Sequence, residues 1–191
     1  MDAAAMSARF VLLDRDGTIN EDVDHLLDPA QVRLIPGAAE AIRMLRDLGL
    51  GIVVVTNQSP VGRGWISMTE LDAIHARLVD QLMRRGATID GIYACPHGPE
   101  AGCACRKPAT GLALRAAAEH GFDPSQSFVV GDHRGDMELG RALGATSILL
   151  LTGHGRQELE HGAGEVADAV VADLPAAAEV IRSMVANGAA P

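Results

Sequence analysis

The sequence contains few basic residues and no basic cluster. Its 16 Lys and Arg residues face 25 Asp and Glu residues, which gives a formal net charge of −9. Proteins that bind nucleic acid present clustered positive charge to the phosphate backbone. The sequence therefore predicts no nucleic-acid partner, and an anionic substrate would have to be held by a few local charges.

Long apolar runs and aromatic residues are scarce as well. No segment approaches the roughly 18 uninterrupted apolar residues of a membrane span. The start, MDAAAMSARF, lacks the charged region and apolar stretch of a secretory signal. We therefore expect a cytoplasmic protein with no membrane partner. At 3% aromatic residues, no stacking platform for a nucleobase is evident.

Cysteine is limited to three residues, Cys95, Cys103 and Cys105. An odd number in one short stretch is poor material for a disulfide framework. Together with His97 they form a C-x-H…C-x-C set, which can close a tetrahedral Zn²⁺ site. Because protein would fill all four positions, we assign this zinc a structural role. The alternative is three buried free cysteines.

Short apolar segments alternate with segments of helical spacing throughout the chain. The expected strands are 10–13, 51–55, 89–93, 127–130 and 147–151, with a short one at 169–171. The expected helices are 38–48, 69–85, 111–120, 136–143 and 174–185. This alternation predicts one α/β domain over residues 7–186, Rossmann-like, with a three-layer parallel sheet covered by helices on both faces. No segment is long enough for a large cap domain, and we expect a monomer.

Two aspartates, Asp14 and Asp16, follow the first strand one residue apart. Two close carboxylates repel each other unless they share a cation or a proton, so the pair predicts a bound metal. Asp14 is a candidate nucleophile, and Asp16 is then placed to protonate the leaving oxygen. The D-x-D spacing alone is equally typical of a turn or a surface loop.

Other polar residues follow the later strands. Thr56 offers a hydroxyl to a phosphoryl oxygen, although a Thr at a strand end is often a turn former. Lys107 could neutralise a transferring phosphate, although a lone Lys is usually solvated. Asp132 ends a strand, and Asp136 stands near a helix start, where it could simply cap the helix.

The order of these motifs along the chain resembles that of the haloacid dehalogenase superfamily of magnesium-dependent phosphohydrolases. The motifs are strand-D-x-D-G-T, strand-T-N, the Lys and strand-G-D-x-x-x-D, and the resemblance covers nearly the whole chain. The resemblance implies that Asp14 attacks phosphorus and that Asp16 acts as general acid and base. It implies that Thr56 and Lys107 hold the phosphoryl oxygens. Mg²⁺ would be bound by Asp14, Asp132 and the backbone carbonyl of Asp16, all hard oxygen ligands.

Within the superfamily, the chain looks like the D-glycero-D-manno-heptose 1,7-bisphosphate 7-phosphatase and histidinol-phosphate phosphatase branch. The segments that carry this likeness are DRDGTIN, VVVTNQS, CPH…C-x-C-R-K-P and VVGD. That likeness implies hydrolysis of the 7-phosphate of a heptose bisphosphate for nucleotide-activated heptose synthesis. The alternatives are a histidinol-phosphate phosphatase, another small sugar-phosphate phosphatase, or a non-catalytic zinc-binding interaction module.

The resemblance and the surrounding sequence also suggest which residues contact the substrate. Pro60 stands where the branch usually has Gly, His133 stands where Lys is common, and NEDVDHLLD lacks the usual Gly-Tyr. These departures bear on specificity more than on the chemistry. The candidate substrate-binding residues are Asn57, Gln58, Ser59, Arg63, Arg106, Asp22, His25 and His133.

Overall fold

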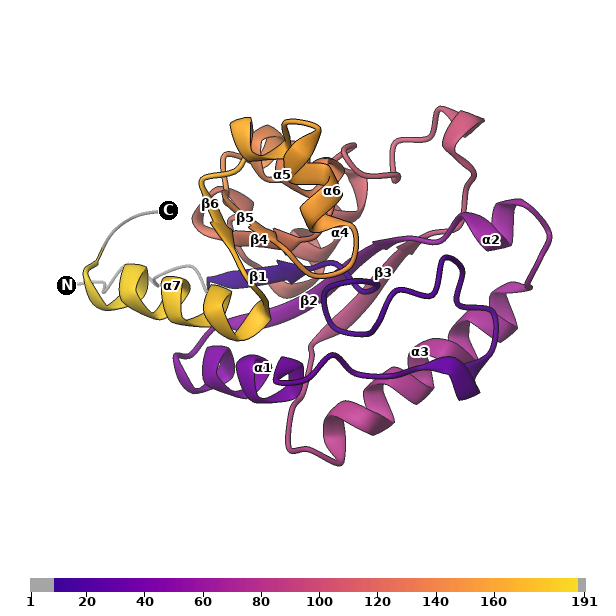
Figure 1. The fold of residues 1–191 in the computed structure, drawn as a ribbon, viewed down its shortest axis with the longest axis horizontal. Coiled ribbons are helices and arrows are strands. Elements are labelled where there is room, and N and C mark those ends of the chain that lie inside the picture. The colour runs from indigo at the N-terminus through magenta and orange to yellow at the C-terminus, as the bar shows by residue number, and fades with distance from the viewer. Residues whose placement is uncertain (1–8, 189–191) are drawn as a thin grey trace.

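The computed structural model describes residues 9–188 and contains a six-stranded parallel sheet in the order β3-β2-β1-β4-β5-β6 (Figure 1). The strands are β1 (Phe10–Leu13), β2 (Gly51–Asn57), β3 (Gly91–Cys95), β4 (Phe128–Gly131), β5 (Thr146–Leu150) and β6 (Ala169–Val171). The α-helices are α1 (Ala38–Asp47), α2 (Ser59–Gly62), α3 (Met68–Met83), α4 (Gly111–His120), α5 (Arg134–Leu143), α6 (Gly155–Glu160) and α7 (Leu174–Ala186). The predicted α/β architecture is confirmed. Residues 7 and 8 of the expected domain lie outside the described residues.

The side chains of β1 alternate between two hydrophobic cores. Val11 and Leu13 pack in one core with α1, α3 and α7, whereas Phe10 and Leu12 pack in the other with α4 and α5. Successive strand residues point to opposite faces of a sheet, so an all-apolar strand such as FVLL requires helices on both faces. Figure 1 shows α1, α3 and α7 along the lower side of the sheet.

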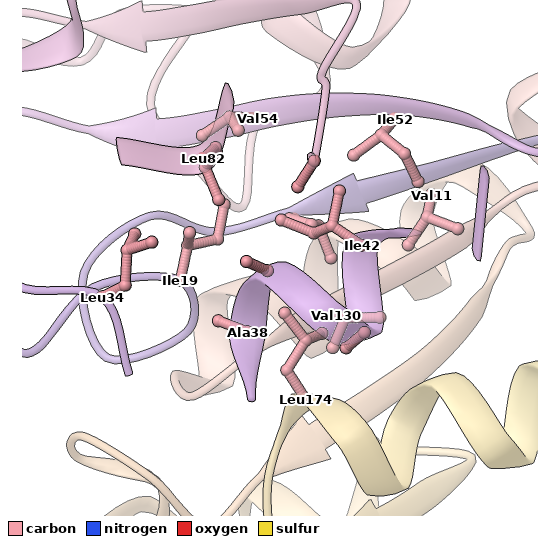
Figure 2. Packing of buried hydrophobic residues seen from close by; sticks show 14 of the residues in the cluster. Val11, Ile19, Leu34, Ala38, Ile42, Ile52, Val54, Leu82, Val130 and Leu174 are labelled. Atoms are coloured by element: carbon pink, nitrogen blue, oxygen red, sulfur yellow. The ribbon is translucent and has the colours of Figure 1, made fainter. Parts of the chain in front are cut away.

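Helix α1 illustrates how the sequence produces this packing. Gly37, at φ +82°, turns the chain into the helix, and a residue with a side chain would adopt this backbone conformation only with strain. Ala38, Ala41, Ile42 and Leu45 then recur at helical spacing and are buried. Figure 2 shows Ala38 and Ile42 directed into the cluster that also holds Val11 of β1. Truncating a buried Ile such as Ile42 to Ala costs about 2–5 kcal/mol.

Several boundaries differ from those the sequence predicts, and side-chain hydrogen bonds explain two of them. Helix α5 begins at Arg134 because Asp136 accepts a hydrogen bond from the backbone N–H of His133, the N-cap residue. Strand β3 begins at Gly91 because the carboxylate of Asp90 accepts hydrogen bonds from the Ile52 backbone and from Arg46. The short helices α2 and α6 were not expected.

The strand order reverses direction at β1, which lies between β2 and β4. In parallel sheets of this kind, ligands bind outside the carboxyl ends of the strands at such a switch point. Asp14 continues β1 there, and its backbone N–H donates to the Val130 carbonyl at 2.9 Å. Across residues 9–188, no helix combines the length and apolarity needed to cross a membrane.

Candidate active site

A cleft of about 400 Å³ opens at this edge of the sheet. Most of the polar residues predicted from the sequence line it, although they come from four different strand ends and the loops after them. The lining residues are Asp14, Asp16, Asp22, Asp24, His25, Leu26, Thr56, Asn57, Gln58, Ser59, Pro60, Arg106, Lys107, His133, Gly135, Asp136 and His154.

Lys107 lies at the bottom of the cleft between two carboxylates. Its Nζ is 2.8 Å from Oδ1 of Asp14 and 2.6 Å from Oδ1 of Asp136. Burial disfavours the charged ammonium, but the Asp136 and Asp14 carboxylates outweigh this effect and raise the pKa of Lys107. Lys107 therefore carries a fixed positive charge next to the candidate nucleophile.

Asn57 fixes the backbone of Lys107. Its Oδ1 accepts a hydrogen bond from the Lys107 N–H at 3.0 Å, and its Nδ2 donates to the Lys107 carbonyl at 3.2 Å. The side chain that the sequence suggested for substrate contact thus joins the end of β2 to the segment after the cysteine loop.

Asp132 lies beneath the cleft and is fully buried. Its Oδ2 accepts a hydrogen bond from the His154 backbone N–H at 2.8 Å, and its Oδ1 lies 3.0 Å from Nδ1 of His133. Gly17, at φ +74°, packs so closely that a Cβ there would lie 2.2 Å from Oδ2 of Asp132. The carboxylate therefore occupies a tightly enclosed position.

Excess negative charge makes this place suitable for a cation. Ligand atoms of Asp14, Asp132, His133 and Asp136 all lie within 4.8 Å of one another. Burial, followed by the charge of Asp14, raises the pKa of Asp132, while burial raises the pKa of Asp136 to about 7 against the pull of Lys107. Hard carboxylate oxygens so placed fit a divalent cation such as Mg²⁺, which would relieve the repulsion.

Asp16 is held by three neighbouring side chains. Arg15, Asn20 and Gln58 all donate hydrogen bonds to its carboxylate. Burial opposes the ionised form, but the charge and hydrogen bonds of Arg15, together with the two amides, lower the pKa of Asp16. Gln58 also donates to Oγ1 of Thr56 at 2.8 Å, so it links Asp16, which follows β1, to Thr56 near the end of β2.

The four predicted zinc ligands come together beside the cleft. Sγ of Cys105 lies 3.1 Å from Sγ of Cys95, 3.4 Å from Sγ of Cys103 and 3.1 Å from Nδ1 of His97. Ligands bound to one zinc at about 2.3 Å in tetrahedral geometry would be about 3.8 Å apart. The cluster therefore needs only small adjustments to hold such an ion.

The remaining predicted substrate contacts separate into two groups. Asp22, His25, Ser59, Arg106 and His133 line the cleft. Among the described residues, the lining set does not include Arg63, whose guanidinium lies over the Trp65 ring at 5.0 Å from its centroid.

Three polar cleft residues were not predicted as contacts. Nε2 of His154 lies 2.8 Å from Oδ2 of Asp22, and Asp24 and His154 both line the cleft. The third is Asp136, which the sequence suggested only as a cap. His154 follows β5, so the rule that polar residues after parallel strands meet at one edge could have found it.

Comparisons with known proteins show which family the chain belongs to. A family model described as HAD-hydrolase-like matches residues 104–177. The D-glycero-beta-D-manno-heptose-1,7-bisphosphate 7-phosphatase of Pseudomonas putida is 42% identical over 159 residues, covering 82% of this chain and 90% of the relative. The enzyme of the same name from Bordetella bronchiseptica is 36% identical over 172 residues, covering 90% and 96%.

Solved structures of similar proteins give the same result. The D,D-heptose 1,7-bisphosphate phosphatase of Bordetella bronchiseptica, complexed with magnesium and phosphate, superposes with a TM-score of 0.85 at 35% identity, covering 92% of this chain and 98% of that one. The enzyme from Burkholderia thailandensis gives a TM-score of 0.70 at 33% identity, covering 92% and 99%. The chain therefore belongs to the D-glycero-D-manno-heptose-1,7-bisphosphate 7-phosphatase family of HAD-like hydrolases.

Proposed function

We propose that this protein removes the 7-phosphate of D-glycero-D-manno-heptose 1,7-bisphosphate, a step in nucleotide-activated heptose synthesis. The observation that carries the proposal is the position of Asp14, whose carboxylate lies 2.8 Å from the Lys107 ammonium at the cleft bottom. A nucleophilic carboxylate can attack an anionic phosphate only where positive charge is also present. The names of the relatives supply the substrate.

The reaction proceeds in two displacements. A carboxylate oxygen of Asp14 attacks phosphorus while Lys107 and the Thr56 hydroxyl hold the phosphoryl oxygens. The bond to the sugar oxygen breaks, and that oxygen takes a proton from Asp16, which leaves an aspartyl phosphate on Asp14. Water then attacks the phosphorus of this aspartyl phosphate and gives a proton back to Asp16. The bond between phosphorus and the Asp14 oxygen breaks, which restores the Asp14 carboxylate and releases inorganic phosphate.

Two metals fit the donor sets described above. Mg²⁺ would be held by Asp14, Asp132 and the Asp16 backbone carbonyl, and it supplies positive charge to the transferring phosphate. Zn²⁺ would be held by Cys95, His97, Cys103 and Cys105 with no open position, so its role is to stiffen the loop that leads to Lys107. The solved Bordetella relative contains magnesium and phosphate, which supports the first assignment.

The test compares two substrates with the magnesium-loaded protein. We expect kcat/KM for the heptose bisphosphate to exceed that for histidinol phosphate by at least about 10-fold, or about 1.4 kcal/mol of transition-state binding. Phosphorus NMR assigns the released phosphate to C7 or C1. Equal or reversed preference would favour the histidinol-phosphate phosphatase, and hydrolysis at C1 would contradict the proposed regiochemistry.

The matched control is Asp14→Asn, which removes the nucleophilic charge with little change in volume. We expect it to fold normally and to lose turnover. Activity within about tenfold of the unmodified protein would contradict the assignment of Asp14 as nucleophile. Binding of zinc without any turnover in the unmodified protein would instead favour an interaction module.

A further inference from the structure

Arg15 stands between the two aspartates of the first motif, and its side chain is 1% exposed. Its Nη2 donates to Oδ2 of Asp16 at 2.7 Å, and its Nε lies 3.1 Å from the other carboxylate oxygen. The same Nη2 also donates to Oε1 of Gln58 at 2.9 Å. A planar guanidinium that uses two nitrogens on one carboxylate fixes its orientation as well as its charge.

Gln58 completes the arrangement from the end of β2. Its Nε2 donates to Oδ2 of Asp16 at 2.9 Å, and its backbone N–H donates to the Cys95 carbonyl at 2.7 Å. Asn20 donates to the opposite oxygen of Asp16, also at 2.9 Å. Both oxygens of Asp16 are therefore held, while its side chain remains 25% exposed and lines the cleft.

Stability alone is a poor explanation for this network. Burying a guanidinium carries a desolvation cost that one ion pair often fails to offset, and apolar replacements are frequently as stable. Nη1 of Arg15 has no hydrogen-bond partner among the described residues. The network also aims one functional carboxylate into the cleft, which an apolar core would not do.

We propose that Arg15 and Gln58 are positioning residues that hold the Asp16 carboxyl group where it gives its proton to the leaving oxygen. Their hydrogen bonds favour the ionised form of Asp16 in the free protein, and the negative charge of the bound phosphate opposes that preference, so Asp16 takes up its proton when the substrate binds. The proposal rests on the proposed function, since it requires Asp14 to form the phosphoenzyme and Asp16 to act as its general acid. Arg15 and Gln58 make no contact with the substrate in this role, and they act on the reaction only through Asp16.

The experiment uses two phosphate esters that differ in their need for a proton. 4-Nitrophenolate leaves without protonation, whereas the sugar alkoxide of the heptose bisphosphate needs the proton of Asp16. The parameter kcat/KM covers the steps up to the first irreversible one, here phosphoryl transfer to Asp14. It therefore reports the protonation of the leaving group and not the later hydrolysis.

Arg15→Lys keeps the charge but loses the bidentate hydrogen bond to Asp16. We expect it to lower kcat/KM for the sugar ester by about 10²-fold. The value for 4-nitrophenyl phosphate should change by less than about threefold. Gln58→Met, which keeps the length of the side chain, should shift the ratio in the same direction by about tenfold. Asp16→Asn should give the largest shift and serves as the reference.

Arg46→Lys is the matched control, because Arg46 also makes a bidentate hydrogen bond to a carboxylate. That carboxylate belongs to Asp90 and lies away from the cleft. It should leave both substrates unaffected. Equal losses on the two esters in Arg15→Lys and Gln58→Met, or no loss, would overturn the proposal. If Arg15→Lys does not fold, Gln58→Met decides. Failure of the proposed function can be told apart from failure of this positioning role. In that case the unmodified protein would hydrolyse neither ester, or its turnover would not need Asp14.

Discussion

The ammonium of Lys107 lies 2.6 Å from Oδ1 of Asp136, while Oδ2 of the same carboxylate accepts the His133 backbone N–H at 3.1 Å. Asp136 therefore caps α5 and also holds Lys107. The helix cap is confirmed, and the contact with Lys107 adds a second role. This carboxylate joins the start of α5 to the segment after the cysteine loop, and it fixes Lys107 opposite Asp14.

The first prediction concerns this shared carboxylate. Asp136→Asn keeps an oxygen for the cap but removes the charge that opposes Lys107. Lys107 then pairs with Asp14 alone, which weakens Asp14 as a nucleophile, and we expect kcat/KM to fall by about 10- to 100-fold, or about 1.4–2.7 kcal/mol. Steady-state kinetics measure this loss. Glu138→Gln, which breaks the exposed Arg134–Glu138 pair of the same helix, is the control and should have no effect. Unchanged kinetics in Asp136→Asn would contradict the second role.

The second prediction concerns magnesium. Protein stripped of magnesium by dialysis with a weak chelator, but retaining zinc, should lose at least about 99% of its turnover, because Asp14 would face an anionic phosphate with too little positive charge. Added Mg²⁺ should restore it. Elemental analysis of the same samples reports both metals. Full turnover in samples that contain zinc but no magnesium would contradict the separation of the two sites.

The third prediction concerns the cysteine cluster. Protein purified without chelator should contain one zinc per chain, and Cys105→Ser should lower both the zinc content and the melting temperature, because metal binding contributes directly to the order of such loops. Ala104→Ser introduces the same side chain at the neighbouring position and should change neither. Absence of zinc from the unmodified protein would show that the cluster is a set of free thiols.

The sequence predicts well which polar residues meet at the edge of the sheet that carries the candidate active site, and the reason is physical. Strands such as FVLL and GIVVV are buried on both faces, so they are parallel, and the polar residues after them meet at one edge. The meeting of Asp14, Thr56 and Asp132 follows from this rule and needs no knowledge of the loops.

Contacts made through long loops could not be predicted in the same way. Arg15 and Gln58 are 43 residues apart, and their hydrogen bond depends on how two loops pack above the sheet. Whether Lys107 reaches Asp136 depends likewise on the path of the loop that carries the cysteines. Arg63 illustrates the opposite case. Its position soon after β2 suggested that it contacts the substrate, whereas its guanidinium lies over the Trp65 ring.

The fourth prediction concerns His75 on α3. Burial, followed by the positive charge of Arg15, lowers the pKa of His75 from 6.5 to about 4. The folded protein thus resists protonation of a group that the unfolded chain protonates below about pH 6.5, so stability is present above that pH and is lost as pH falls from about 6.5 to about 4. At pH 5 the loss amounts to about 2 kcal/mol, or about 4–8 °C in Tm.

His75→Gln removes this titration, so its Tm should fall less than that of the unmodified protein between pH 7.5 and pH 5. Calorimetry at the two pH values measures the difference. The control is His161→Gln, since His161 is exposed after α6 and its replacement should preserve the full pH dependence. Identical pH dependence in His75→Gln and in the unmodified protein would show that His75 accepts a proton freely in the folded state.

The last prediction concerns the second phosphate of the substrate. Arg106 lines the cleft next to Lys107, and its Nη1 donates to the His97 carbonyl at a long 3.4 Å, whereas the ammonium of Lys107 pairs with Asp14 and Asp136. It is therefore available to hold an anion away from the transferring group. We expect Arg106→Gln to lower kcat/KM for the heptose 1,7-bisphosphate by about tenfold. The kcat/KM for the heptose 7-phosphate, which lacks the C1 phosphate, should stay nearly unchanged.

Arg63→Gln is the matched control, since Arg63 lies over Trp65 and should matter for neither substrate. An equal loss on both substrates would place Arg106 at the transferring phosphate, and a selective loss in Arg63→Gln would move the C1-phosphate site to the Trp65 side of the rim.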